Sequence, residues 1–118
     1  MPQLKFEYSD NIKSEVNFQH VLSHVHQLLA QTISCNIEDC KSRIIRLDDF
    51  FIGQGEKENA MIHLEVNILE GRSNELKHDL GQKLVAMLNS FFSDVEGMNL
   101  QITVEIKDII KNNYHKIA

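Results

Sequence analysis

The sequence predicts an α+β fold: a two-layer α/β sandwich in which duplicated β-α-β units give a four-stranded sheet with two helices on one face. Three stretches alternate apolar and polar residues, and two others carry apolar residues at helical spacing. The first helical stretch superposes on the second after a shift of 59 positions. The 118 residues fit a single domain, with pseudo-repeats at about residues 2–52 and 60–110.

The first unit consists of a strand, a helix and a second strand. Apolar and polar residues alternate over Pro2–Tyr8, which is typical of a half-buried strand. An apolar stripe then runs from Phe18 to about Ile33 at spacings of three and four residues, as in an amphipathic helix. Residues around Asp39–Ile52 follow as a strand that is apolar in its middle. The stripe of the helix includes Phe18, Val21, Leu22, Val25, Leu28 and Leu29.

The second unit repeats this order after a loop at 53–59. Alternation over Ile62–Ile68 predicts a strand, and an apolar stripe over Leu76–Phe91 predicts a helix with Ser73 as its N-cap. Alternation over Leu100–Ile106 predicts the last strand. We expect right-handed crossovers, with both helices on one face of the sheet and the other face uncovered. An exposed apolar sheet face usually marks an interface, so we expect an oligomer.

Composition argues against several classes of protein. The net charge of -5 argues against a nucleic-acid surface, which needs a clustered excess of Lys and Arg. No apolar run approaches the roughly 20 residues of a membrane span. Polar residues interrupt the N-terminal stretch where a signal region would lie, so we expect a cytoplasmic protein. Cys35 and Cys40 match no zinc signature, and we expect free thiols and no metal site.

Pro2 is the only proline in the chain. One interpretation is structural, because proline suits the first residue of a strand, where its missing N–H costs no ladder hydrogen bond. The other interpretation is chemical. Removal of Met1 would leave proline as the N-terminal residue, a secondary amine. Burial or nearby cations lower the pKa of an amine, and a neutral amine at pH 7 acts as a general base.

Cations lie at two places that suit an anion site. Arg72 is in a turn between a strand and a helix, where its guanidinium can hold a carboxylate with two hydrogen bonds. Lys41 and Arg43 share one face of the second strand. They indicate either an anion site or pairing with acidic residues. His20 and His24 have a spacing that suits a metal, but they lie off the apolar stripe and we interpret them as a solvated face.

The residues resemble those of the tautomerase superfamily. Met1-Pro2 precedes a strand, and the segment ILEGRS at 68–73 precedes a helix. Along almost the whole chain the sequence is most similar to the longer branch of that superfamily, the 5-carboxymethyl-2-hydroxymuconate Δ-isomerases. The similar features are the EYSDNI opening, the KSRIIRLDDF strand, the GRS turn and the EI-containing final strand.

The resemblance implies a homotrimer that uses no metal and no organic cofactor. It implies that the free N-terminal proline, Pro2, is the general base and that Arg72 binds a substrate carboxylate. The strand cation stays open: Arg43 matches the arginine of smaller tautomerases, whereas Lys41 occupies the position of an arginine in the longer branch. Lysine keeps the charge but loses the planar grip of a guanidinium.

The expected function is that of an isomerase of an unsaturated 2-hydroxy or 2-keto dicarboxylate in the breakdown of aromatic compounds. The partner is therefore a small-molecule keto or enol carboxylate, with no nucleic acid and no membrane. One alternative keeps Pro2 but changes the reaction to a hydration or a decarboxylation. Another is a binding protein similar to macrophage migration inhibitory factor, with vestigial tautomerase activity.

Overall fold

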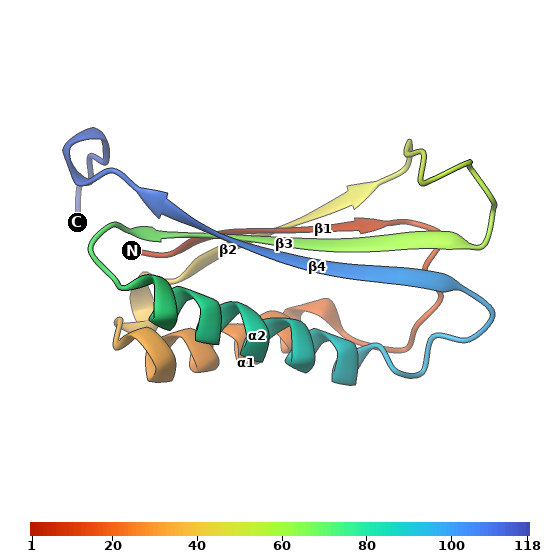
Figure 1. Ribbon diagram of the computed structural model, residues 1–118, viewed down its shortest axis with the longest axis horizontal. Helices are drawn as coiled ribbons and strands as arrows, with labels where there is room; N and C mark the ends of the chain where they lie inside the picture. Colours follow the sequence, from red (N-terminus) through yellow and green to blue (C-terminus); the bar gives the residue numbers. More distant parts are fainter.

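Four strands in the order β2-β1-β3-β4 form one sheet, and two helices cover one of its faces (Figure 1). The computed structural model describes residues 1–118. The predicted fold class is confirmed. The strands are β1 (Gln3–Ser9), β2 (Lys41–Leu47), β3 (Asn59–Leu69) and β4 (Asn99–Ile109), and the helices are α1 (Phe18–Ile33) and α2 (Asn74–Phe91).

The sheet is built from two β-α-β units that meet at its centre. Strands β1 and β2 are parallel, as are β3 and β4, whereas β1 and β3 are antiparallel. Three buried residues of α1 are offset from the three buried residues of α2 by the same 59 positions that the sequence pattern showed. They are Val21, Val25 and Leu29 in α1, and Leu80, Leu84 and Leu88 in α2. Neither helix is long and apolar enough to cross a membrane.

Local side chains set the helix ends. The Asn17 side chain accepts hydrogen bonds from the main chain of the first turn of α1, and Ser34 ends that helix in the left-handed region with φ 57°. The Ser73 hydroxyl accepts a hydrogen bond of 3.1 Å from the Leu76 N–H. The predicted N-cap of α2 is therefore confirmed.

Strand β2 is shorter than the sequence predicts. A short 3₁₀ helix at Ile37–Asp39 replaces its expected start, and the chain leaves the sheet after Leu47. The reason is the length of the partner: β2 is an edge strand whose only neighbour is β1. Leu47 pairs with Ser9, the last residue of β1, so no hydrogen-bonding partner remains for the residues beyond it.

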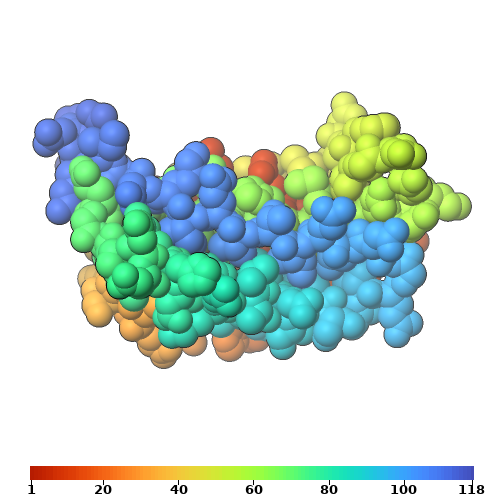
Figure 2. Space-filling view, viewed as in Figure 1, coloured from red at the N-terminus to blue at the C-terminus, as the bar shows by residue number.

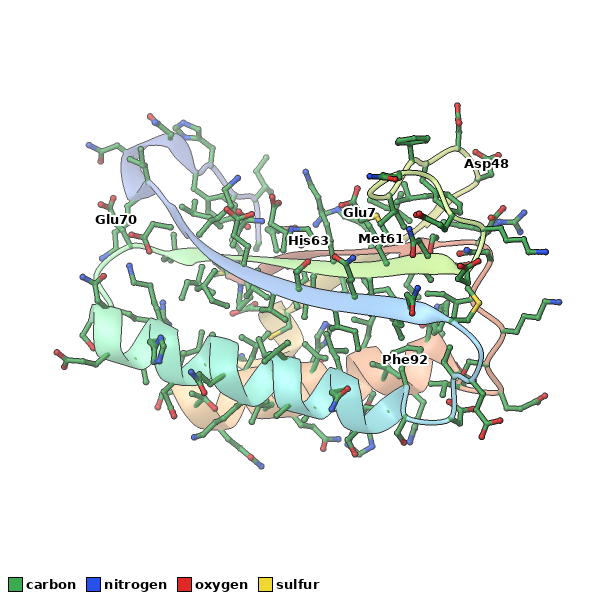
Figure 3. The ribbon with its side chains drawn as sticks, turned by 45° about the vertical axis from the view of Figure 1, so that its right-hand side comes forward. Glu7, Asp48, Met61, His63, Glu70 and Phe92 are labelled. Atoms are coloured by element: carbon green, nitrogen blue, oxygen red, sulfur yellow. The ribbon has the colours of Figure 1, made fainter.

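The uncovered face of the sheet is polar, which corrects the expectation of an apolar face. Glu65 forms ion pairs with Lys5 at 3.7 Å and with Lys107 at 3.4 Å, and His63 lies 3.7 Å from Glu105. Figure 3 shows His63 on the side of the sheet away from the helices. The oligomer therefore stays a prediction, but it no longer rests on an apolar sheet face.

Two segments rise above the uncovered face at opposite ends of the sheet. One is the loop at 48–58, and the other is the segment that follows β4 (Figures 1 and 2). The turn after β3, the end of α1 and both chain termini lie at the end where the C-terminal segment rises (Figure 1). Pro2, Lys41 and Arg72, which the sequence singled out, also lie at this end.

Candidate active site

Pro2 is buried at the start of β1. Its carbonyl accepts a hydrogen bond of 3.1 Å from the Lys41 N–H, the first residue of β2. The parallel register pairs Gln3 with Lys41, so Pro2 is one step before the paired residues. Its main chain is therefore fixed to the sheet through the carbonyl.

Arg72 lies in the turn between β3 and α2, at the same end of the sheet. Its half-buried guanidinium donates to the Leu69 carbonyl at 3.2 Å and to the Ile33 carbonyl at 3.4 Å. Ile33 is the last residue of α1, where carbonyls lack a helical partner. A guanidinium has five N–H donors, so these two bonds hold the group in place and leave donors for an anion.

The strand cations Lys41 and Arg43 are both exposed on the uncovered face. The Lys41 ammonium donates to the Asp39 carbonyl at 3.2 Å, and the Arg43 guanidinium reaches the Leu4 carbonyl at 3.5 Å. Neither forms an ion pair with a carboxylate. Within the chain both charges therefore remain available to an anion, and an anion site at these residues stays a prediction.

The sequence analysis missed the segment after β4, which folds back over this end of the sheet. The Lys111 N–H donates to the Glu70 carboxylate at 2.8 Å, and the Gln3 side chain donates to the Tyr114 hydroxyl at 2.9 Å. The Lys116 ammonium lies 3.3 Å from the Met1 sulfur. The alternation that marks strands stops before this segment, so periodicity gave no signal for it; its lysines and tyrosine were the only indication.

Cys40 lies beside Pro2, immediately before β2. It is buried, and its sulfur is 3.8 Å from that of Cys35. Burial and the neighbouring Cys35 raise the pKa of the Cys40 thiol to about 12. Both cysteines are free, as expected, and the raised pKa keeps Cys40 neutral and poorly nucleophilic at pH 7.

The His20 and His24 rings pack against each other with centroids 4.6 Å apart, and both contact Phe91. No third His, Cys, Asp or Glu is placed to complete a metal site with them. They are exposed or half-buried on the outer side of the helices, and they lie outside the site at the end of the sheet.

Three cations lie at this end of the sheet. Lys41, Arg72 and Lys116 come from three different elements, in a chain whose net charge is -5. Cations grouped in this way can bind carboxylates and stabilise negative charge that develops on an oxygen. Pro2 lies at the same end of the sheet, buried next to the first residue of β2.

Comparison with known proteins agrees with this architecture. The family model of 5-carboxymethyl-2-hydroxymuconate isomerase matches residues 2–117. The 5-carboxymethyl-2-hydroxymuconate Delta-isomerase of Escherichia coli is 27% identical over 99% of this chain and 98% of its own. A 5-carboxymethyl-2-hydroxymuconate isomerase structure from Deinococcus radiodurans R1 superposes with a TM-score of 0.88, at 26% identity, over 98% of this chain and 88% of its own.

A more distant neighbour shares the fold alone. A fused 4-OT protein, described as a symmetric trimer, superposes with a TM-score of 0.76 at 19% identity, over 97% of this chain and 90% of its own. The paired β-α-β units and these superpositions define a protein of the tautomerase superfamily. Within it, the chain belongs to the 5-carboxymethyl-2-hydroxymuconate isomerase family and is an isomerase.

Proposed function

We propose that this isomerase moves a proton within an unsaturated 2-hydroxy or 2-keto dicarboxylate similar to 5-carboxymethyl-2-hydroxymuconate, in the breakdown of aromatic compounds. Pro2, freed by the removal of Met1, is the general base. The observation that carries the proposal is the buried position of Pro2 at the end of the sheet where Arg72 and Lys41 also lie. The names of the related isomerases support the choice of substrate class.

The proposed reaction is a proton transfer from oxygen to carbon. The neutral amine of Pro2 takes the proton of the substrate's 2-hydroxyl group, and the electron pair moves into the conjugated chain. The resulting ammonium returns the same proton to a carbon atom, so an O–H bond breaks, a C–H bond forms and the C=C bond shifts. Nothing is oxidised or reduced overall.

The cations supply binding and charge stabilisation in this mechanism. Arg72 binds one carboxylate with the N–H groups that its two main-chain bonds leave unused. We assign Lys41 the stabilisation of the enolate oxygen, since it follows the residue beside Pro2 and carries a positive charge. Arg43 lies two residues further along β2, opposite Lys5, and we assign it a supporting role in attracting the substrate.

We further propose that three chains assemble into a homotrimer in the cytoplasm, with one site per chain and no metal or organic cofactor. The fused 4-OT neighbour is described as a symmetric trimer. Only the first β-α-β unit can present an N-terminal amine, since the second begins at Asn59 inside the chain. A proton transfer of this kind requires a base and positive charge, which the chain's own residues supply.

The test is Pro2→Ala, with the mass of each purified protein used to verify that Met1 has been removed. We expect kcat for ketonisation of 2-hydroxymuconate to fall in Pro2→Ala, because alanine leaves a primary amine in place of the positioned secondary amine. Where the amine is lost altogether we expect a fall of about 100-fold or more, because removing a positioned base commonly costs about 10² to 10⁴ in rate. A chain extended by one residue before Pro2 is the matched control, since it blocks the amine and keeps the proline. Unchanged ketonisation in Pro2→Ala would overturn the proposal.

The alternative reactions are separated in the same experiment. NMR analysis of the products identifies hydration or decarboxylation if either is the true reaction. Binding of the dienol without turnover in the wild type would point to a binding protein instead.

A further inference from the structure

We infer that the C-terminal segment at 111–116 forms one wall of the active site and that Lys116 binds a carboxylate of the substrate. The inference rests on the proposed function, because it concerns how that site selects a dicarboxylate. The inference goes beyond the proposed function because it adds the segment at 111–116 and the Lys116 cation to the site. Neither the sequence motifs nor the names of the relatives assign them a role.

The segment is attached to three parts of the chain that surround Pro2. The Lys111 N–H bonds the carboxylate of Glu70 in the turn after β3, at 2.8 Å. The Tyr114 hydroxyl accepts a bond of 2.9 Å from the side chain of Gln3, the residue next to Pro2. Because these attachments come from different strands, the segment crosses the end of the sheet rather than extending away from it (Figure 1).

Lys116 makes a third attachment, and it marks the position of the substrate. Its ammonium lies 3.3 Å from the sulfur of Met1 and 3.8 Å from the carboxylate of Asp39. A thioether is a weak acceptor, and the ion pair with Asp39 is partly exposed and therefore weak. With Met1 removed, as proposed for the active protein, the Lys116 ammonium loses its contact with the sulfur and keeps only the weak pair with Asp39, which leaves its charge for an anion next to Pro2.

The charges of the site match a substrate with two carboxylates. The Arg72 guanidinium is held by two hydrogen bonds, one to the Ile33 carbonyl at the end of α1 and one to the Leu69 carbonyl at the end of β3. Lys116 approaches from the C-terminal segment and is anchored near the start of β2 through Asp39. Two cationic groups held by separate elements can each take one carboxylate, which places the conjugated chain between them and beside Pro2.

The experiment compares two substrates in Lys116→Gln, Lys116→Arg and the control Lys83→Gln. Lys83 carries the same charge but pairs with Asp79 on the exposed side of α2. For 2-hydroxymuconate, we expect Lys116→Gln to raise KM about tenfold with kcat within twofold, as one charge-assisted hydrogen bond is lost. For the monocarboxylate enol of phenylpyruvate we expect no change in KM, because Arg72 holds its single carboxylate. Lys116→Arg should stay within threefold of the wild type.

The outcome that overturns the inference is an equal KM for the dicarboxylate in Lys116→Gln and Lys83→Gln. A binding measurement distinguishes failure of the inference about Lys116 from failure of the proposed function. Calorimetric titration with muconate, which has both carboxylates but no hydroxyl to ionise, should show a Kd about tenfold weaker in Lys116→Gln than in Lys83→Gln. If the wild type ketonises neither enol, the proposed function fails, and the two Kd values still decide whether Lys116 binds a dicarboxylate.

Discussion

Arg72 has a structural task besides the carboxylate binding that we propose for it. Its position in the GRS turn indicated a cation for a carboxylate, but its guanidinium also joins the end of α1 to the end of β3. The two bonds reach a carbonyl 39 positions away and one three positions away. A side chain held in this way loses little freedom on binding a ligand, because its geometry is set before the substrate arrives.

The two tasks of Arg72 can be separated by Arg72→Lys and Arg72→Ala. Loss of both main-chain hydrogen bonds in Arg72→Ala should lower the free energy of unfolding by about 1–3 kcal/mol. Arg72→Lys should retain part of that stability, yet raise KM for the dicarboxylate about tenfold, because an ammonium lacks the planar two-bond grip. Urea unfolding and steady-state kinetics measure the two effects. Equal KM in the wild type and Arg72→Lys would contradict the binding role.

At the scale of elements, ion pairs join neighbouring strands across the uncovered face of the sheet. Glu65 on β3 lies between Lys5 on β1 and Lys107 on β4. A hydrogen bond from Asn67, together with Lys107 and Lys5, lowers the pKa of the Glu65 carboxyl, against the opposing effect of burial. The carboxylate is thus stabilised in the folded chain relative to the unfolded one.

Glu65→Gln should therefore destabilise the protein in a pH-dependent manner. Because the folded pKa lies below the unfolded value of 4.5, the stabilisation is fully present above pH 4.5 and is lost as pH falls through the folded pKa. At pH 7 we expect the variant to be less stable by about 1 kcal/mol, as for partly exposed ion pairs. The difference should shrink below pH 4.5 in urea unfolding.

Glu96→Gln is the control for this change, since Glu96 is exposed in the loop after α2 and has no ion-pair partner. Its free energy of unfolding should stay within about 0.5 kcal/mol of the wild type at both pH values. A pH-independent loss in Glu65→Gln would show that its carboxylate acts through packing rather than through charge.

At the scale of the whole molecule, the polar sheet face changes how an oligomer must form. A face covered by paired charges and His63 can line a wet interior, but it does not supply an apolar interface. Large exposed apolar residues lie elsewhere: Phe51 in the loop at 48–58 is 79% exposed, and Ile110 and Ile117 after β4 are 55% and 102% exposed. We expect the contacts between chains to involve these end segments and the sheet edges.

The prediction for the assembly is a single species of three chains of 13.6 kDa each. Sedimentation equilibrium at micromolar concentration measures this mass directly. Because the predicted contacts include an apolar loop, Phe51→Ser should weaken the assembly, whereas Lys83→Gln on the exposed side of α2 should leave it intact. A wild-type protein that sediments as one chain would contradict the trimer.

The sequence by itself determined the elements of this protein. Alternation placed β1, β3 and β4 within a few residues of their observed bounds, and the apolar stripe predicted α1 from Phe18 to Ile33 as observed. Ser73 predicted the start of α2, because a helix cap depends on residues three positions apart. The lone Pro2 and the cation of the GRS turn likewise led to the proposed site, because an N-terminal amine and a guanidinium can be recognised from residue type alone.

Tertiary structure decided what depends on contacts between distant residues. The length of β2 follows from where β1 ends, and the polarity of the uncovered face follows from the register of three strands. The bond from Arg72 to Ile33 and the return of Tyr114 to Gln3 join positions 39 and 111 apart. Periodicity reports only on neighbours along the chain, so the wall at 111–116 and Lys116 beside Met1 became visible only once the chain had folded.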